Sequence, residues 1–182
     1  MRLFVAVFPP LKIREETLRT ARSLLPGDRI RWSRPENIHM TLKFLGDVGE
    51  EKLDEVRAAL ENACADHTPF DARTAGLGAF PSARRARILW AGVGEGSEQL
   101  RSLAAHVDAA LSRSGFERET RSYEPHLTLG RVRGRPMKLN LPEEAGGDPF
   151  EVSRVELVES MLTGTGPIYR TIESFFLGVE KS

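Results

Sequence analysis

The chain has 182 residues, 40% of them hydrophobic and 29% charged, which is typical of a folded soluble protein and excludes a disordered one. Its 26 basic and 26 acidic residues cancel, which argues against a protein that coats nucleic acid through bulk charge. No apolar run reaches the length of a membrane span, no signal peptide is recognisable, and the single cysteine excludes an internal disulfide, so we expect a cytoplasmic protein without membrane contact.

The spacing of apolar residues predicts an alternating order of strands and helices. We expect helices over residues 9–25, 50–65 and 97–112, and strands over residues 3–8, 30–32, 38–45, 70–80, 88–93, 125–132, 150–162 and 169–179. Residues 133–149, with three glycines and three prolines, are expected to form an exposed loop. No linker divides the chain, and a helix followed by strands recurs after residue 96, which indicates two pseudo-symmetric lobes.

Two tetrapeptides share one pattern, in which a histidine is followed by any residue, a threonine and an apolar residue. They occupy residues 39–42 and 126–129, and each lies in a predicted strand. Because successive side chains of a strand point to opposite faces, His39 and Thr41 share one face, as do His126 and Thr128. If the two lobes face each other, these four polar side chains converge on one cavity.

Such a quartet suits phosphoryl chemistry without a metal ion. An imidazole, whose ordinary pKa is about 6.5, can take a proton from water when neutral and give one to a leaving oxygen when charged. Threonine hydroxyls can donate hydrogen bonds to the non-bridging oxygens of a phosphate. The residues alone leave open which histidine is the acid and which is the base. His67 and His106 lack the motif and give no metal-ligand spacing with it, so we expect them to be structural or solvated.

The surroundings of both motifs narrow the interpretation to one family. The chain resembles the bacterial and archaeal RNA 2′,3′-cyclic phosphodiesterases, also called 2′-5′ RNA ligases, of the two-histidine phosphoesterase superfamily. The resemblance spans nearly the whole chain and is carried by the two motifs and by residues 2–7, 31–32, 35–46, 81–90, 123–131, 159–162 and Tyr169.

This resemblance implies an α+β fold over residues 1–182, with two pseudo-symmetric lobes, two antiparallel sheets lining a central cleft and helices outside. It implies hydrolysis of an RNA or nucleotide 2′,3′-cyclic phosphate to a 2′-phosphate, with 2′-5′ RNA ligation as the related reaction. By analogy His39 is the general acid, His126 is the general base, and Thr41 and Thr128 hold the phosphate. We expect a monomer without cofactor or metal, whose partner is an RNA or nucleotide with a cyclic phosphate end. The alternative is a nucleotide- or RNA-binding module of the same fold with little turnover.

Four further residues are candidates for contact with the substrate. Phe8 ends the first strand, where members of the resembled family place an aromatic residue, and it can either stack on a base or belong to the core. Lys43 has the parity of the polar residues of the first motif, and Tyr123 precedes the second motif. Arg131 reaches the face of the second motif only if its strand ends there or contains a bulge.

Charge is concentrated in blocks although it sums to zero. Residues 1–35 carry a net charge of +5 and residues 113–138 a net charge of +4, and these stretches lead into or surround the motifs. We therefore expect a positive mouth on the cleft. The run of Arg84, Arg85 and Arg87 has two interpretations, a solvated loop or a contact with an RNA backbone.

Overall fold

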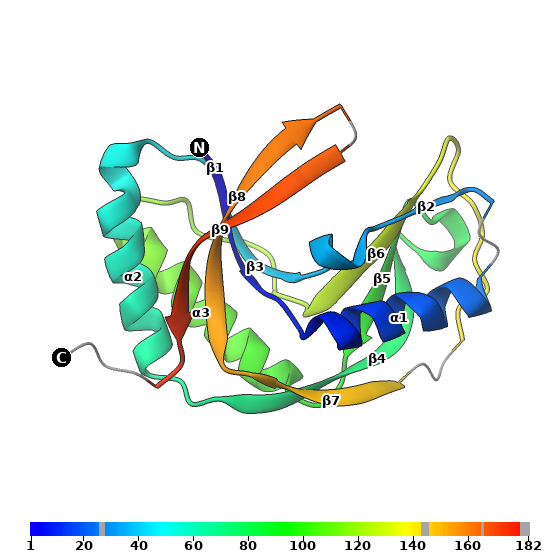
Figure 1. The fold of residues 1–182 in the computed structure, drawn as a ribbon, viewed down its shortest axis with the longest axis horizontal. Helices are drawn as coiled ribbons and strands as arrows, with labels where there is room; N and C mark the ends of the chain where they lie inside the picture. Colours follow the sequence, from blue (N-terminus) through cyan, green and yellow to red (C-terminus); the bar gives the residue numbers. More distant parts are fainter. Residues whose placement is uncertain (26–27, 143–145, 165, 179–182) are drawn as a thin grey trace.

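Two antiparallel sheets form the framework of the molecule, and helices pack against them (Figure 1). The computed structural model describes residues 1–25, 28–142, 146–164 and 166–178. The four-stranded sheet has the order β3 (Met40–Asp47), β1 (Arg2–Val7), β8 (Arg154–Thr163) and β9 (Gly166–Phe176). The five-stranded sheet has the order β2 (Ile30–Trp32), β6 (His126–Val132), β5 (Ile88–Val93), β4 (Phe70–Phe80) and β7 (Gly146–Val152).

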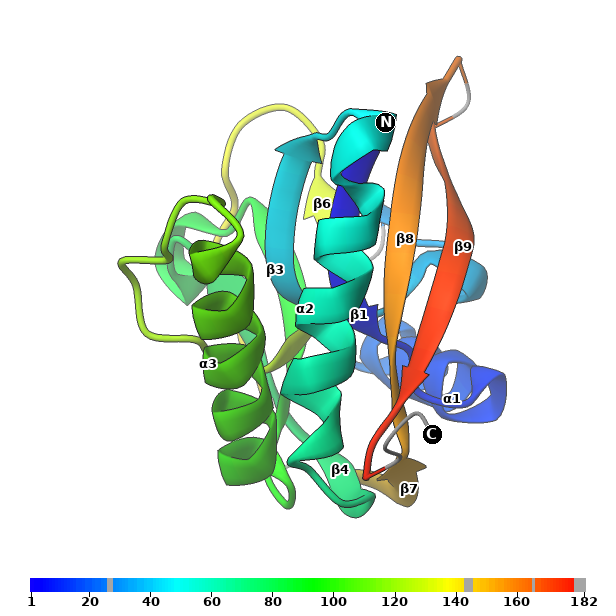
Figure 2. The ribbon, with the colours of Figure 1, turned by 90° about the vertical axis from the view of Figure 1, so that its left-hand side faces the viewer.

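The helices are α1 (Leu11–Leu24), α2 (Leu53–Ala65) and α3 (Ser97–Arg113), with short 3-10 turns η1 (Pro35–Asn37), η2 (Glu50–Lys52) and η3 (Ala83–Arg85). Helices α2 and α3 lie side by side over the four-stranded sheet, where α2 contacts β9 and α3 contacts β3 (Figure 2). Helix α1 contacts β7 of the five-stranded sheet. The helices leave the sides of the sheets that face each other uncovered (Figure 1).

The two halves are interleaved along the chain. Helix α1 follows a strand of the four-stranded sheet but lies against the five-stranded one. Helix α3 connects β5 and β6 of the five-stranded sheet but lies against the four-stranded one. Strands β7 and β8 are separated by Ser153 alone and belong to different sheets. The four-stranded sheet is therefore covered by a helix that connects strands of the other sheet, and the chain passes from one sheet to the other at α1 and at Ser153.

Amphipathic helices explain how the core forms. In α3 the apolar residues at steps of three and four, among them Leu100, Leu103, Val107 and Leu111, are buried as their spacing predicts. In α2 the same spacing buries Val56 and Leu60, among others. Both helices bury these stripes against one face of the four-stranded sheet, so no helix of this pair covers its opposite face.

The expected fold class is confirmed, and most elements lie where the sequence predicts them, but two predictions are wrong. The loop expected over residues 133–149 is pinned by a β-bridge between Met137 and Ala86, it buries Leu139, and β7 already begins at Gly146. The single strand expected over residues 150–162 is two strands in different sheets, because the chain changes sheet at Ser153. The predicted strand end at residue 179 lies outside the described residues, as do residues 26–27, which follow the first predicted helix.

No helix in the described ranges is both long enough and apolar enough to cross a bilayer.

Candidate active site

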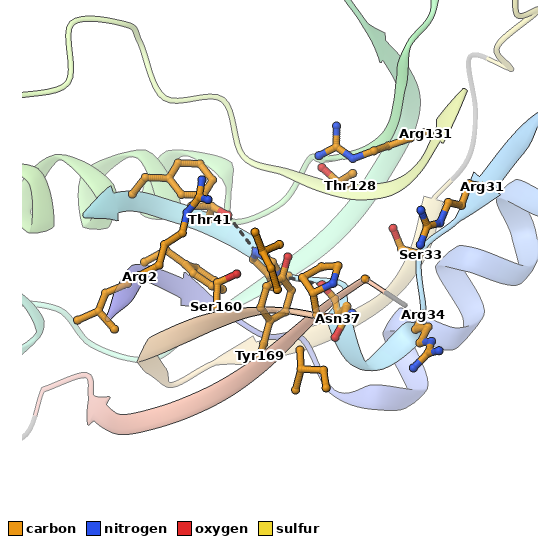
Figure 3. A pocket seen from close by; sticks show the side chains of 18 of the residues that line it. Arg2, Arg31, Ser33, Arg34, Asn37, Thr41, Thr128, Arg131, Ser160 and Tyr169 are labelled. Atoms are coloured by element: carbon orange, nitrogen blue, oxygen red, sulfur yellow. Dashed lines mark hydrogen bonds between the residues drawn. The ribbon is translucent and has the colours of Figure 1, made fainter. Parts of the chain in front are cut away.

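A cleft of about 780 Å³ lies between the two sheets and brings both motifs together (Figure 3). His39 and Thr41, at the start of β3, line it from the four-stranded sheet. His126 and Thr128, on β6, line it from the five-stranded sheet. The quartet singled out by the sequence therefore shares one cavity, with one histidine and one threonine contributed by each half.

Both imidazole rings are oriented by the same kind of hydrogen bond, from Nδ1 to the backbone carbonyl two residues earlier. Nδ1 of His39 donates a hydrogen bond to the carbonyl oxygen of Asn37 over 2.7 Å, and Nδ1 of His126 donates one to the carbonyl oxygen of Glu124 over 2.7 Å. Because a carbonyl oxygen only accepts, each Nδ1 carries a proton and each Nε2 is left for proton exchange with a ligand. The hydroxyl of Thr41 donates to Nε2 of His39 over 3.0 Å.

Each motif strand contains one extra residue within its motif relative to a neighbouring strand. Along β3 the pairing with β1 skips Leu42, between the pairs Ala6–Thr41 and Val5–Lys43. Along β6 the pairing with β5 skips Leu129, the equivalent residue of the second motif. A β-bulge shifts the alternation of faces, so side chains beyond it exchange sides of the sheet.

The bulges determine on which side of its sheet each of two candidate residues lies. Arg131 lies beyond the bulge in β6 and lines the cleft. Lys43 lies beyond the bulge in β3, and the expectation that it faces the cleft is wrong. It is buried, and its ammonium group donates to Asp108 of α3 and to the carbonyl oxygen of Glu117. The cleft position that parity assigns to Lys43 is taken by Phe44, whose side chain is 76% exposed.

Phe8 and Tyr123 do not line the cleft either. The ring of Phe8 lies against the ring of His39, with 5.1 Å between their centroids, and the guanidinium group of Arg14 lies over the Phe8 ring, 5.6 Å from its centroid. Tyr123 packs against the main core, and its hydroxyl is buried. Burial raises the pKa of this hydroxyl, so it stays protonated. Phe8 is therefore placed to support His39, and Tyr123 belongs to the core.

A sequence model of the 2′-5′ RNA ligase superfamily matches residues 9–161, a range that contains both motifs. The chain belongs to this superfamily. Curated relatives named RNA 2′,3′-cyclic phosphodiesterase include proteins of Aquifex aeolicus, 35% identical over 98% of both chains, and of Methanothermobacter thermautotrophicus, 37% identical over 97% of this chain and 99% of that one. The expected family is thereby confirmed, and with it the enzyme class.

Solved structures of this superfamily share the fold. Escherichia coli LigT complexed with 3′-AMP superimposes with a TM-score of 0.83 at 25% identity, over 97% of both chains. A protein from Thermus thermophilus superimposes with a TM-score of 0.83 at 28% identity, over the whole of both chains. These two solved structures therefore share the two-sheet framework described above.

In this superfamily member, aromatic rings enclose both histidines. Phe4 stacks on His39 with 4.9 Å between ring centroids, and Tyr169 of β9 meets the same ring edge-on at 5.2 Å. Phe80 meets His126 edge-on at 5.3 Å, and the indole of Trp90 lies 6.1 Å from it. Sequence reasoning missed these rings as supports of the histidines, because they come from neighbouring strands and no motif marks them.

Burial lowers the pKa of His39 from 6.5 to about 4. The hydrogen bond to the carbonyl of Asn37 opposes this change, while Coulomb interactions with Arg14 and with the imidazole of His126 add to it. In the free protein His39 is therefore neutral at pH 7, and its Nε2 lone pair accepts the hydrogen bond from Thr41.

The cleft is lined by positive charge. Arg2, Arg31, Arg34 and Arg131 approach it from different elements, and no carboxylate is among the described residues that line it (Figure 3). Polar groups of Asn37, Ser160 and Tyr169 also lie on its wall. Of these arginines the sequence marks only Arg131 individually, and the net positive charge of residues 1–35 is the signal for the other three.

The described part of the chain contains no evident metal centre. No group of three or more histidine, cysteine, aspartate and glutamate side chains comes together there. His67 and His106 form a hydrogen bond of 2.8 Å between their rings on the surface of the α2–α3 pair, without a third ligand among the described residues.

Proposed function

We propose that the chain hydrolyses the 2′,3′-cyclic phosphate at the end of an RNA or nucleotide to a 2′-phosphate without a metal ion, and that the same site serves 2′-5′ RNA ligation. The observation that carries this proposal is the pair of imidazoles, each fixed through Nδ1, with both rings on one cleft. The names of the relatives and the arginine lining of the cleft agree with a phosphate substrate. Since the two histidines belong to different sheets, residues 1–182 act as one catalytic domain, and one chain suffices.

In the proposed reaction, a water molecule attacks phosphorus and the bond to the ribose 3′ oxygen breaks. Nε2 of His126 takes a proton from the water, and Nε2 of His39 gives a proton to the 3′ oxygen. The hydroxyls of Thr41 and Thr128 donate to the non-bridging oxygens, where negative charge is concentrated. Arg131 lies on the same wall as Thr128 and adds positive charge beside them. In ligation, the 5′-hydroxyl of a second RNA replaces water as the nucleophile, and the same two proton transfers join the chains.

The acid role of His39 depends on the bound anion. His39 is neutral in the free protein, so it needs a proton on Nε2 before it can protonate the leaving oxygen. A cyclic phosphate carries a negative charge, and its arrival beside Nε2 raises the pKa of the imidazole. Thr41 can then turn its hydroxyl from Nε2 to the phosphate.

The test is incubation with a 2′,3′-cyclic nucleotide in the presence of a chelator, with chromatography of the product. We expect the 2′-phosphate, and we expect replacement of His39 or His126 by Ala to lower kcat by about two orders of magnitude or more, since each proton transfer contributes roughly 100-fold or more. Loss of activity in the presence of the chelator would contradict the proposal that the reaction needs no metal ion. Tight binding without turnover would favour the nucleotide-binding module.

The pH dependence of the residual kcat/KM of the H126A variant distinguishes the two roles of His39, because this constant reports the free enzyme and the second imidazole of the pair is absent. If His39 is the acid, kcat/KM falls as the pH rises above about 4, the pKa of free His39, while kcat holds to a higher pH because bound phosphate retains the proton. If His39 is the base, kcat/KM instead falls as the pH drops below that value. A profile of the second kind would reverse the two assignments.

A further inference from the structure

One end of the five-stranded sheet is rich in basic residues, with Asp28 and Glu36 next to its first segment. Three segments, residues 29–35, 81–94 and 125–142, contain ten basic residues and no Asp or Glu. All ten side chains are exposed. We call this surface the basic end; its members are Arg29, Arg31, Arg34, Arg84, Arg85, Arg87, Arg131, Arg133, Arg135 and Lys138.

Backbone contacts hold the three segments together. Arg31 on β2 lies directly opposite Arg131 on β6, and the amide of Val132 donates to the carbonyl oxygen of Arg87 over 2.8 Å. The bridge between Ala86 and Met137 joins the η3 region to the chain beyond β6. Strands β2, β6 and β5 run together to this end of the molecule (Figure 1). The basic end is therefore a continuous surface.

Hydrogen bonds to backbone carbonyl oxygens also hold arginines of the basic end close to one another. The guanidinium group of Arg29 donates to the carbonyl oxygens of Arg133 and Arg135, and the amide of Arg133 donates back to the carbonyl oxygen of Arg29 over 2.7 Å. Like charges that face each other across strands destabilise a sheet. A surface built in this way gains from a favourable interaction with an anion outside the molecule.

The pairing of basic residues differs between this surface and the rest of the described chain. Elsewhere nine basic residues form ion pairs: Lys12, Lys43, Lys52, Arg57, Arg73, Arg101, Arg118, Arg154 and Arg170. Within the described residues, the members of the basic end other than Arg31 form no ion pair with a carboxylate. Their charge is therefore available to an anionic partner.

The basic end continues into the cleft without a break. Arg31, Arg34 and Arg131 belong to both surfaces, because they line the cleft and lie on the sheet end. A ligand whose terminal phosphate sits between the two histidines and whose body bears further phosphates can follow this continuous charge. Single-stranded RNA has this chemistry, since each nucleotide adds one negative charge.

We propose that the basic end binds the backbone of the RNA that precedes the cyclic phosphate, so that the enzyme selects RNA ends over mononucleotides. This inference rests on the proposed function and extends it from the reacting group to the body of the substrate. The run of Arg84, Arg85 and Arg87 then contacts phosphates several nucleotides from the end.

The test compares adenosine 2′,3′-cyclic phosphate with a single-stranded octaribonucleotide that ends in the same cyclic nucleotide. The readout is the ratio of the two kcat/KM values, measured over a series of KCl concentrations. We expect the octamer to be preferred about tenfold or more at low salt, and the preference to fall as salt rises. Variants R84Q/R85Q and R133Q/R135Q remove two charges each from the basic end.

Each of these double variants is expected to lower the ratio several-fold, and to reduce the slope of its logarithm against log salt by about 0.7 for each interaction with a phosphate that the variant removes. The matched control is K52Q/R113Q, which removes two exposed charges from the half of the molecule that carries α2 and α3. The control is expected to keep the wild-type ratio.

An octamer that is not preferred, or a ratio that falls equally in the control, would overturn the inference while leaving hydrolysis of the mononucleotide intact. If neither substrate is hydrolysed, the proposed function fails. Fluorescence anisotropy of the labelled octamer then tests separately whether the basic end binds RNA. Binding that R84Q/R85Q weakens and K52Q/R113Q does not would still support it. Binding that all variants share would contradict it.

Discussion

At the residue scale, the most consequential side chain is His39, because burial and function impose opposite demands on its charge. The ring lies among Phe4, Phe8 and Tyr169, which stabilise the neutral form. The proposed reaction requires it to carry a proton for part of the cycle. The protein therefore keeps its proton affinity low until an anion arrives.

This arrangement predicts how stability depends on pH. The folded-state pKa of His39, about 4, lies below the 6.5 of the unfolded chain, so between these values the unfolded state binds the extra proton. Stability is then greatest above pH 6.5 and falls as the pH drops towards 4, by about 3 kcal/mol from this residue. Urea unfolding at a series of pH values should give a smaller fall for H39Q than for the wild type.

Burial lowers the pKa of His67 as well. Because His67 is present in both proteins, the difference between their pH-dependent unfolding free energies reports His39. If the unfolding free energies of wild type and H39Q change in parallel between pH 6.5 and 4, the ring of His39 is not desolvated in solution.

Two phenylalanines give a contrast between binding and catalysis. Phe44 is 76% exposed on the cleft, where it can stack on a base, and such a contact is worth about 1–3 kcal/mol. We expect F44A to raise KM for a cyclic nucleotide roughly tenfold with little change in kcat. Phe8 contacts the ring of His39 outside the cleft, so F8A should lower kcat instead. Steady-state kinetics that show the same pattern for both variants would refute this distinction.

At the scale of the element, the motif strands show how well the alternation of side chains along a strand predicts which face each residue occupies. Alternation correctly places His39 with Thr41 and His126 with Thr128, because these pairs precede the bulges. It fails at Lys43, and it leaves Arg131 dependent on a bulge that no residue type announces. The skipped residues, Leu42 and Leu129, are ordinary apolar residues in sequence, so the sequence alone could not locate the bulges.

The support of His126 depends on a glycine in β4. Gly78 pairs with Trp90, and a Cβ atom at Gly78 would overlap the indole ring. In G78A the indole must move, and we expect a loss of about 1–3 kcal/mol of stability from overpacking together with a lower kcat. G146A in β7 is the matched control, since its Cβ would meet only ordinary contacts. Equal kcat for the two variants would show that the indole does not position His126.

At the scale of the whole molecule, interleaving ties the two halves into one folding unit. Helix α3 covers the four-stranded sheet although both its neighbouring strands belong to the five-stranded one, and α1 leads from the four-stranded sheet to the five-stranded one that it contacts, so we expect neither half to keep its core when the other unfolds. Sequence reasoning predicts the two lobes from the repeated motif. It does not predict this exchange, because the switch at Ser153 carries no local signal beyond a continuous run of strand-forming residues.

The prediction is a single unfolding transition. Both tryptophans, Trp32 on β2 and Trp90 on β5, lie in the five-stranded sheet, so their fluorescence follows that half. Far-ultraviolet circular dichroism follows mainly the helices, of which α2 and α3 cover the four-stranded sheet. Urea transitions followed by the two signals should share one midpoint. Separate midpoints would mean that the halves unfold independently.

The distribution of charge has a consequence for the approach to a substrate, before any contact is made. Ten basic residues lie at one end of the sheet, while all 26 acidic residues lie in the rest of the chain. A molecule with no net charge whose charges are separated in this way can carry an electric dipole, and the field of a polyanion exerts a torque on a dipole. For the RNA substrate proposed above, we expect such a dipole to turn the open cleft towards the nucleic acid during diffusion, so that encounters occur in the productive orientation more often than random tumbling allows.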